Sequence, residues 1–248
     1  MSDEGEDVLT FGDTTLCEGD LTRLEPGGWL NDNLIQFYFD YLAEVDCVEL
    51  KTHLRFIGPS VMFMLSFLED PAEIRETLSS IDALAPDDPV AQSQPVLIFM
   101  PVNNNEDWDR VGGSHWSLLV FDRQRNLFLH LDSLGCSNRS VAEAHAHKLS
   151  PYLCGESSET APIHHLASPQ QENSSDCGLY VLALSEFLAK RPLEVEQWTA
   201  SEAVLAALSA KLTPSAVAAK RDELKRLIQR LVREDQVKQL LRRLNYEP

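Results

Sequence analysis

Three segments of the sequence carry residues that could perform nucleophilic catalysis. His115 stands directly before the apolar run that begins at Trp116, Asp132 closes a second apolar run, and Cys177 precedes a third. A cysteine attacks as the thiolate, which a helix N-terminus and a nearby imidazolium stabilise. A carboxylate on the other ring nitrogen fixes the tautomer of the histidine. These residue types therefore indicate a cysteine nucleophile served by a His–Asp pair.

A fourth polar side chain belongs to the same set. Gln171 lies six residues before Cys177. Its amide could join the backbone N–H of Cys177 in binding the oxyanion that forms during acyl transfer. Taken singly, each of these residues has an ordinary explanation as a surface histidine, a turn former or a core cysteine. Their order and compatible placement favour the catalytic interpretation.

The elements predicted around these residues can bring them together. Apolar runs predict strands over 96–103, 115–122 and 127–132, and a turn over 122–126 makes the last two a hairpin. In such a hairpin His115 and Asp132 lie at the same open end. A strongly apolar segment, 177–190, predicts a buried helix with Cys177 in its first turn. His130, on the same strand face as Asp132, is a candidate for supporting the site.

The rest of the chain predicts helices on both sides of a small mixed sheet, an α+β class. A helix that carries Leu34 and Ile35 is capped by Asn31 or Asp32, and Asp70 caps a helix that starts at Pro71. Strand-and-turn structure is expected over 7–25, and a loop over 82–95. The remaining predicted elements are strands over 53–57 and 163–167 and helices over 59–68, 140–152, 196–212 and from Pro214, with Thr213 as its cap.

Composition narrows the classes of function. The 248 residues, 44% of them hydrophobic, suit one globular domain. The net charge of −18 makes nucleic acid a poor partner, because an acidic body repels phosphate backbones. The acidic charge favours a protein partner with a basic face, although a solvated acidic surface without a partner is equally common.

Cysteine usage and the N-terminus indicate a reducing compartment. The five cysteines are scattered and include no Cys-x-x-Cys pair, which argues against a disulfide framework and a zinc site. The paired histidines at 145, 147, 164 and 165 are expected at the surface rather than as metal ligands. The acidic N-terminus lacks the features of a signal peptide. We expect a cytoplasmic or nuclear protein that is monomeric and does not bind membranes.

The motifs resemble those of the Ulp/sentrin-specific cysteine proteases, which remove ubiquitin-like modifiers from proteins. The matching segments are Trp29-Leu30-Asn31-Asp32, His115-Trp116, Asp132 and the Gln-x-Asn-x-x-Asp-Cys-Gly pattern from Gln171 to Gly178. Within the family, the sequence is most similar to the deneddylase branch, which acts on the Nedd/Rub modifier. The similarity extends from about residue 8 to residue 231.

The resemblance implies an adenain-like fold of the papain-like superfamily, with no metal or organic cofactor. It makes Cys177 the nucleophile, His115 the general base and acid, Asp132 the residue that orients His115, and Gln171 the oxyanion donor. The protease domain would occupy residues 1–233, and residues 234–248 would be a basic helical extension.

The resemblance also implies a binding site for the modifier. Trp29 and Trp116 would cover a narrow tunnel for its Gly-Gly tail, and Asp32 would meet one of its basic residues. Ordinary packing remains the alternative role for both tryptophans. The polar segment 103–114 would close over the tail as a lid.

The predicted function is therefore a cysteine isopeptidase that cleaves after the Gly-Gly terminus of a Nedd/Rub-type modifier. It would deconjugate modified proteins and could process the modifier precursor. Two alternatives stay open at this point: a SUMO-specific isopeptidase, and a pseudo-protease that binds a modifier without turnover. The intact set of four catalytic candidates argues against the second.

Overall fold

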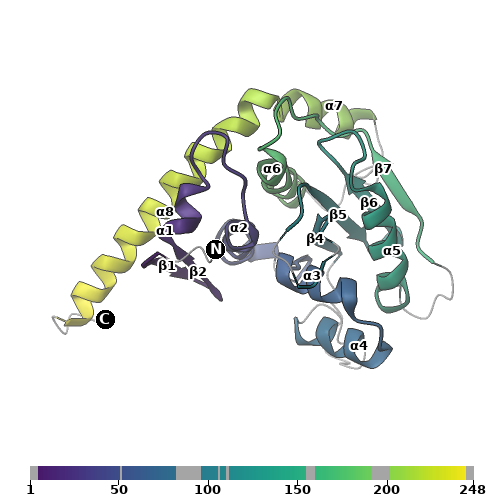
Figure 1. Ribbon diagram of the computed structural model, residues 1–248, viewed down its shortest axis with the longest axis horizontal. Helices are drawn as coiled ribbons and strands as arrows, with labels where there is room; N and C mark the ends of the chain where they lie inside the picture. The colour runs from purple at the N-terminus through teal and green to yellow at the C-terminus, as the bar shows by residue number, and fades with distance from the viewer. Residues whose placement is uncertain are drawn as a thin grey trace.

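The computed structural model describes residues 5–50, 52–81, 96–105, 107–109, 112–154, 160–191 and 202–243. At its centre is a five-stranded sheet in the order β3-β4-β5-β6-β7 (Figure 1). The two outer pairs are parallel and the inner pairs are antiparallel. The strands are β3 (Leu54–Phe56), β4 (Leu97–Asn103), β5 (Trp116–Asp122), β6 (Leu127–Leu131) and β7 (Ile163–Leu166).

The sheet divides the molecule into two hydrophobic cores, because successive side chains on a strand point to opposite faces. On β5, Leu118 and Val120 join one core, whereas Leu119 and Phe121 join the other. All seven β5 residues are buried, as expected for a strand covered on both faces. Because helices cover both faces of the sheet, its side chains can reach a substrate only at the ends of the strands.

Helices cover each face of the sheet (Figure 1). The first core holds buried residues of α2 (Asp32–Tyr41), α6 (Cys177–Ala189), α7 (Glu202–Lys211) and α8 (Pro214–Arg243). The second core holds those of α3 (Pro59–Phe67), α4 (Pro71–Ser80) and α5 (Arg139–Leu153). Helix α6 is buried along nearly its whole length because it is apolar on all sides.

The N-terminal segment and the C-terminal helix lie together, away from the sheet (Figure 1). Strands β1 (Asp7–Phe11) and β2 (Thr14–Cys17) form an antiparallel hairpin, and a short helix, α1 (Glu18–Thr22), follows it. A π-helical turn at Leu42–Asp46 and a 3₁₀ turn at Val48–Leu50 complete the described elements. With 30 residues, α8 is about 45 Å long.

The predicted α+β class is confirmed, and the predicted elements agree with the structure apart from their ends. Asn31 rather than Asp32 caps α2, with its side chain accepting the Leu34 N–H at 3.2 Å. The strand-and-turn prediction missed the helical turn α1. Predictions for 82–95 and 196–201 lie outside the described residues. Helix α8 continues through residue 234 without a break, so the predicted extension begins inside it, and the division of the chain at that point stays a prediction.

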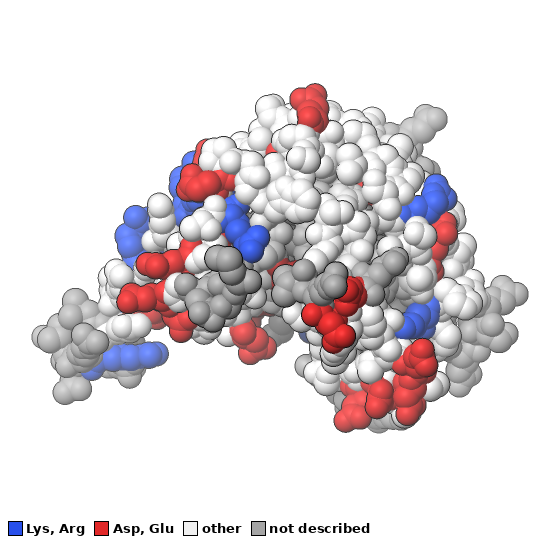
Figure 2. Space-filling view, viewed as in Figure 1, with Lys and Arg blue, Asp and Glu red and all other residues white. Residues whose placement is uncertain are grey.

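Acidic side chains outnumber basic ones on the face shown in Figure 2, where they flank a hollow along the lower edge. Within the described part of the chain, no helix combines the length and the apolar character needed to cross a membrane.

Candidate active site

The strand ends bring His115 and Asp132 into direct contact. The register of β5 and β6 pairs Leu118 with Leu131, so the residues just beyond these positions meet at one edge of the sheet. The Nε2 atom of His115 lies 2.6 Å from Oδ1 of Asp132, and both side chains are buried. The structure thus places the pair at the end of the hairpin that the sequence predicts.

Backbone groups hold the Asp132 carboxylate in place. The N–H of Leu134 donates to Oδ1, and the N–H of Asn138 donates to Oδ2, each at 2.9 Å. Burial alone would raise the pKa of Asp132, but the hydrogen bonds from His115 and from these two amides outweigh it and lower the pKa. The carboxylate is therefore ionised at neutral pH and fixed in orientation.

The protonation of His115 follows from its two neighbours. Burial alone would lower the pKa of the imidazole, but the hydrogen bond with Asp132 and the adjacent Cys177 together raise it to about 9. Since Nε2 is engaged by Asp132, Nδ1 is the ring nitrogen left for a second partner, and it is buried without a hydrogen bond to any described residue. A protonated imidazole at neutral pH places positive charge beside the sulfur.

Cys177 is buried and begins α6, after a loop that its own sequence motif builds. The Asn173 Oδ1 atom accepts hydrogen bonds from the backbone N–H groups of Ser175 and Asp176, each at 3.0 Å. Gly178 leaves room for Leu30, because a Cβ atom at residue 178 would lie 2.8 Å from the Leu30 Cβ. Asn173 of the motif therefore stabilises the turn before Cys177, and Gly178 permits the close packing after it.

Gln171 is oriented from both ends of its amide. Its Oε1 accepts a hydrogen bond from the Ser133 hydroxyl at 2.8 Å, and its Nε2 donates to the Asn173 carbonyl at 2.6 Å. Its backbone N–H donates to the Ser133 carbonyl at 2.8 Å. Because an amide nitrogen carries two hydrogens, one remains available for an oxyanion.

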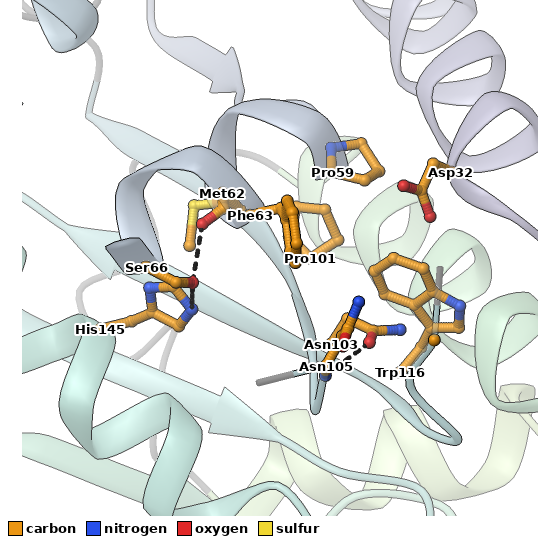
Figure 3. A pocket seen from close by; sticks show the side chains of 11 residues that line it. Asp32, Pro59, Met62, Phe63, Ser66, Pro101, Asn103, Asn105, Trp116 and His145 are labelled. Carbon is orange, nitrogen blue, oxygen red and sulfur yellow. Dashed lines mark hydrogen bonds between the residues drawn. The ribbon is translucent and has the colours of Figure 1, made fainter. Parts of the chain in front are cut away.

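Two of the three predicted substrate contacts share a pocket. Asp32 and Trp116 line it together with Pro59 and Phe63 of α3 (Figure 3). The Trp116 indole donates to the Leu30 carbonyl at 3.2 Å and is 7% exposed, so its ring is fixed. The third, Trp29, is 40% exposed and directly precedes Leu30.

The segment 103–114 reaches the same pocket. Asn103, Asn105 and Gly112 contribute to its lining. Trp108, which is 58% exposed, stacks on the ring of Phe63 with their centroids 5.6 Å apart. Part of the predicted lid therefore rests on α3 beside Asp32 and Trp116.

Sequence reasoning missed several polar residues that hold the site. The buried Asn138 donates its side-chain N–H to the carbonyls of His115 and Val102, at 3.2 and 3.1 Å. The Ser168 hydroxyl donates to the carbonyl of Asp132 at 2.5 Å. The only sequence signal for Asn138 is its position six residues after Asp132, because its side chain binds mainly backbone carbonyls.

The surface assignment of the histidines is wrong for His145. This residue is 5% exposed, and its Nε2 lies 3.4 Å from the Ser66 hydroxyl (Figure 3). Burial lowers its pKa to about 4, so the ring is neutral. Among the residues that the structure describes, no three His, Cys, Asp or Glu side chains are grouped so that they could hold a metal ion.

His130 lies one step away from the His–Asp pair. Its Nε2 contacts the Ser117 hydroxyl at 2.9 Å, and that hydroxyl also accepts from Asn138 at 3.2 Å. Its Nδ1 lies 2.9 Å from Nδ1 of His165. Burial lowers the pKa of His130 to about 4. A neutral His130 supports Asn138 through Ser117 without touching the pair itself.

Comparison with known proteins identifies the family of the chain. Residues 28–231 match the family described as the Ulp1 protease family, C-terminal catalytic domain. The chain belongs to the Ulp1 protease family. It is a cysteine-type peptidase of that family.

Known relatives match three quarters of the chain or more. Sentrin-specific protease 8 of Mus musculus is 34% identical, over 93% of this chain and 96% of the relative. NEDD8-specific protease 1 of Arabidopsis thaliana is 29% identical, over 75% of this chain and 77% of the relative.

Solved structures of the family share the fold. A de-sumoylating protease aligns with a TM-score of 0.66 at 17% identity, over 97% of this chain and 95% of that one. The Ulp1 protease domain in complex with Smt3, the yeast SUMO, aligns with a TM-score of 0.56 at 21% identity, over 87% and 90%. The predicted adenain-like architecture is confirmed by these alignments.

Proposed function

We propose that this protease is a deneddylase that cleaves the bond after the Gly-Gly terminus of a Nedd/Rub-type modifier. The observation that carries the proposal is the buried His115–Asp132 pair, 2.6 Å apart, beside Cys177 at the start of α6. The bond is the isopeptide bond of a modified lysine or the peptide bond of the modifier precursor.

In this mechanism the Cys177 sulfur attacks the carbonyl carbon of the terminal glycine. Gln171 Nε2 and the Cys177 backbone N–H donate to the oxyanion. The His115 imidazolium gives its Nδ1 proton to the leaving amine, and a thioester remains on the enzyme. His115 then accepts a proton from the water that attacks the thioester, which releases the modifier with a free C-terminal carboxyl group and restores the Cys177 thiolate beside the His115 imidazolium.

The tail of the modifier would approach along the pocket that Asp32 and Trp116 line. Trp116 and Trp29 would flank the route to Cys177. The segment 103–114, which contributes Asn103, Asn105 and Gly112 to the pocket, would close over the tail. Asp32 offers a carboxylate to a basic residue of the modifier. The acidic charge of the chain supports a partner with a basic face, because complementary potentials steer association.

The Nedd/Rub modifier is favoured over SUMO by the relatives. Those that match most of the chain include sentrin-specific protease 8 and NEDD8-specific protease 1, whereas yeast ubiquitin-like-specific protease 1 is 25% identical over 73% of the chain and 26% of its own length. The proposal requires one copy of the chain. We place its action in the cytoplasm or nucleus, where cysteines stay reduced.

Covalent capture tests the proposal. The protein is mixed separately with Nedd/Rub, SUMO and ubiquitin that carry an electrophile at the C-terminus, and adducts are measured by intact mass. Cys177→Ala is the negative control, and Cys136→Ala, at an exposed cysteine, is the matched control. We expect an adduct with the Nedd/Rub probe that is lost only in Cys177→Ala.

Each other outcome excludes part of the proposal. An adduct with SUMO alone would agree with the proposed mechanism but contradict the proposed specificity for the Nedd/Rub modifier. Adduct formation by Cys177→Ala would overturn the assignment of the nucleophile. Binding of Nedd/Rub without any adduct or cleavage would identify a pseudo-protease.

A further inference from the structure

A buried arginine on α8 joins the two halves of the site. Arg221 is 6% exposed, and its Nη2 donates to Oδ1 of Asp176 and to the carbonyl of Gly28, each at 2.9 Å. Its Nη1 donates to the carbonyls of Arg23 and Glu25, at 2.8 and 3.2 Å. One side chain thus donates hydrogen bonds to acceptors on two segments that lie far apart in the sequence.

The first of these segments leads into the nucleophile. Asp176 directly precedes Cys177 and is the N-cap residue of α6. The second oxygen of its carboxylate accepts a hydrogen bond from the Asn173 side chain at 2.9 Å. The carboxylate is therefore held between Arg221 and Asn173, which fixes the direction in which the chain enters α6.

The second segment carries the wall of the tail site. Gly28 precedes Trp29, and the next residue, Leu30, binds Trp116 through its carbonyl and packs against Gly178. This stretch is therefore anchored to α8 at Gly28 and to the sheet and α6 at Leu30. Trp29 lies between these two anchors.

The chemistry of the contact favours alignment over simple stabilisation. A buried ion pair adds little net stability compared with well-packed apolar residues of similar volume. The planar guanidinium presents several donors in a fixed fork, which a lysine ammonium does not reproduce.

We propose that Arg221 is a positioning residue of this protease, which aligns Cys177 with the tail site at Trp29. The inference rests on the proposed function, because it takes Cys177 as the nucleophile and Trp29 as a substrate contact. It adds a residue of the C-terminal helix to those that the reaction requires.

The test compares Arg221→Met, Arg221→Lys and the double variant Arg221→Met/Asp176→Leu. The substrate is the Nedd/Rub modifier with a fluorogenic C-terminal leaving group, and unfolding temperature is measured in parallel. We expect Arg221→Met to lower kcat/KM about 100-fold, with kcat reduced and KM raised, because both segments shift. Arg221→Lys should recover part of the loss.

The double variant separates alignment from charge. It leaves no uncompensated carboxylate at residue 176, so it should fold. Its kcat/KM should nevertheless be as low as that of Arg221→Met. The matched control is Lys225→Met, one turn along α8, which removes only the 3.0 Å pair with the Glu25 carboxylate and should leave kcat and KM unchanged. Parent kinetics in the double variant, or in both single variants, would overturn the proposal.

A modifier-free measurement keeps this proposal distinct from the proposed function. Alkylation of Cys177 by iodoacetamide, followed by peptide mass spectrometry, reports the alignment of the thiol with His115. We expect slower alkylation in folded Arg221→Met and in the double variant than in the parent. Equal alkylation rates in the variants and the parent would show that Arg221 does not position Cys177, whatever modifier the parent cleaves.

Discussion

The two sides of the active site differ in how firmly their side chains are held. On the catalytic side, His115 and Asp132 are 3% and 5% exposed, and the carboxylate that binds His115 is held by the N–H of the buried Asn138. On the substrate side, Trp29 and Trp108 are 40% and 58% exposed. Buried, hydrogen-bonded groups need little reorganisation during the reaction, so the catalytic side chains are preorganised. The exposed tryptophans on the substrate side can still be covered by a bound modifier. Changes on the first side should lower kcat, and changes on the second should raise KM.

The largest effect is expected at the general base. His115→Gln should lower kcat roughly 1,000-fold with little change in modifier affinity, because the proton transfers to and from the sulfur and the leaving amine are lost. Steady-state kinetics and equilibrium binding of the modifier measure the two separately. His147→Gln, at an exposed histidine of α5, is the control and should match the parent. If His115→Gln weakened modifier binding without lowering kcat, His115 would not be a catalytic residue.

The oxyanion contact should be next in size. Gln171→Ala is expected to lower kcat about 100-fold, since one donor to the oxyanion is lost. Ser133→Ala should lower it about tenfold, because Ser133 only orients the Gln171 amide. The kcat values of both variants are compared with that of Ser137→Ala on the same loop. An effect of Ser133→Ala confined to KM would contradict this assignment.

The acid–base pair predicts a particular pH profile. In the parent, kcat/KM should fall as the pH rises through about 9, where the imidazolium loses its proton. Asp132→Asn removes the carboxylate that raises this pKa, so the alkaline limb should move toward 6.5, the ordinary value for histidine. An unchanged limb would show that Asp132 does not set the protonation of His115.

The same pair also links stability to pH. Because the pKa of His115 is raised on folding, the contribution of the pair to stability is complete below about 6.5 and is lost as the pH rises through about 9. The unfolding temperature of the parent should therefore fall over this range more than that of His115→Gln.

Substitution on the binding side should have a smaller effect of a different kind. Asp32→Asn is expected to raise KM about tenfold and leave kcat unchanged, and the difference should shrink at high salt. Glu73→Gln, at an exposed carboxylate of α4, is the control. A loss of kcat instead of affinity would mean that Asp32 acts in the chemistry.

The smallest effect is expected at the lid. Trp108→Ala should raise KM only about threefold, because the exposed ring lies at the edge of the pocket and contributes mainly apolar contact. Val237→Ala, at an exposed residue of α8, is the control for loss of apolar surface. A fall in kcat at unchanged KM would indicate that the segment 103–114 orders the reacting groups rather than holding the tail.

The sequence predicts the reacting residues better than their supports. His115, Asp132 and Cys177 must be particular residue types at strand and helix ends, so motif and periodicity together indicate both chemistry and place. Asn138 and Arg221 act mainly on backbone carbonyls, which every residue has, so no pattern identifies their partners. The short helix α1 was missed because five residues are too few to show a helical period.

The position of Arg221 in the chain has a consequence for synthesis. The three residues proposed for the triad are complete at residue 177. The arginine that we infer aligns Cys177 with the tail site is added 44 residues later, on a helix that must pack against the segment 23–28. A nascent or truncated chain that ends before α8 would hold the triad without this alignment. Full proteolytic activity would then appear only after α8 has packed against the segment 23–28.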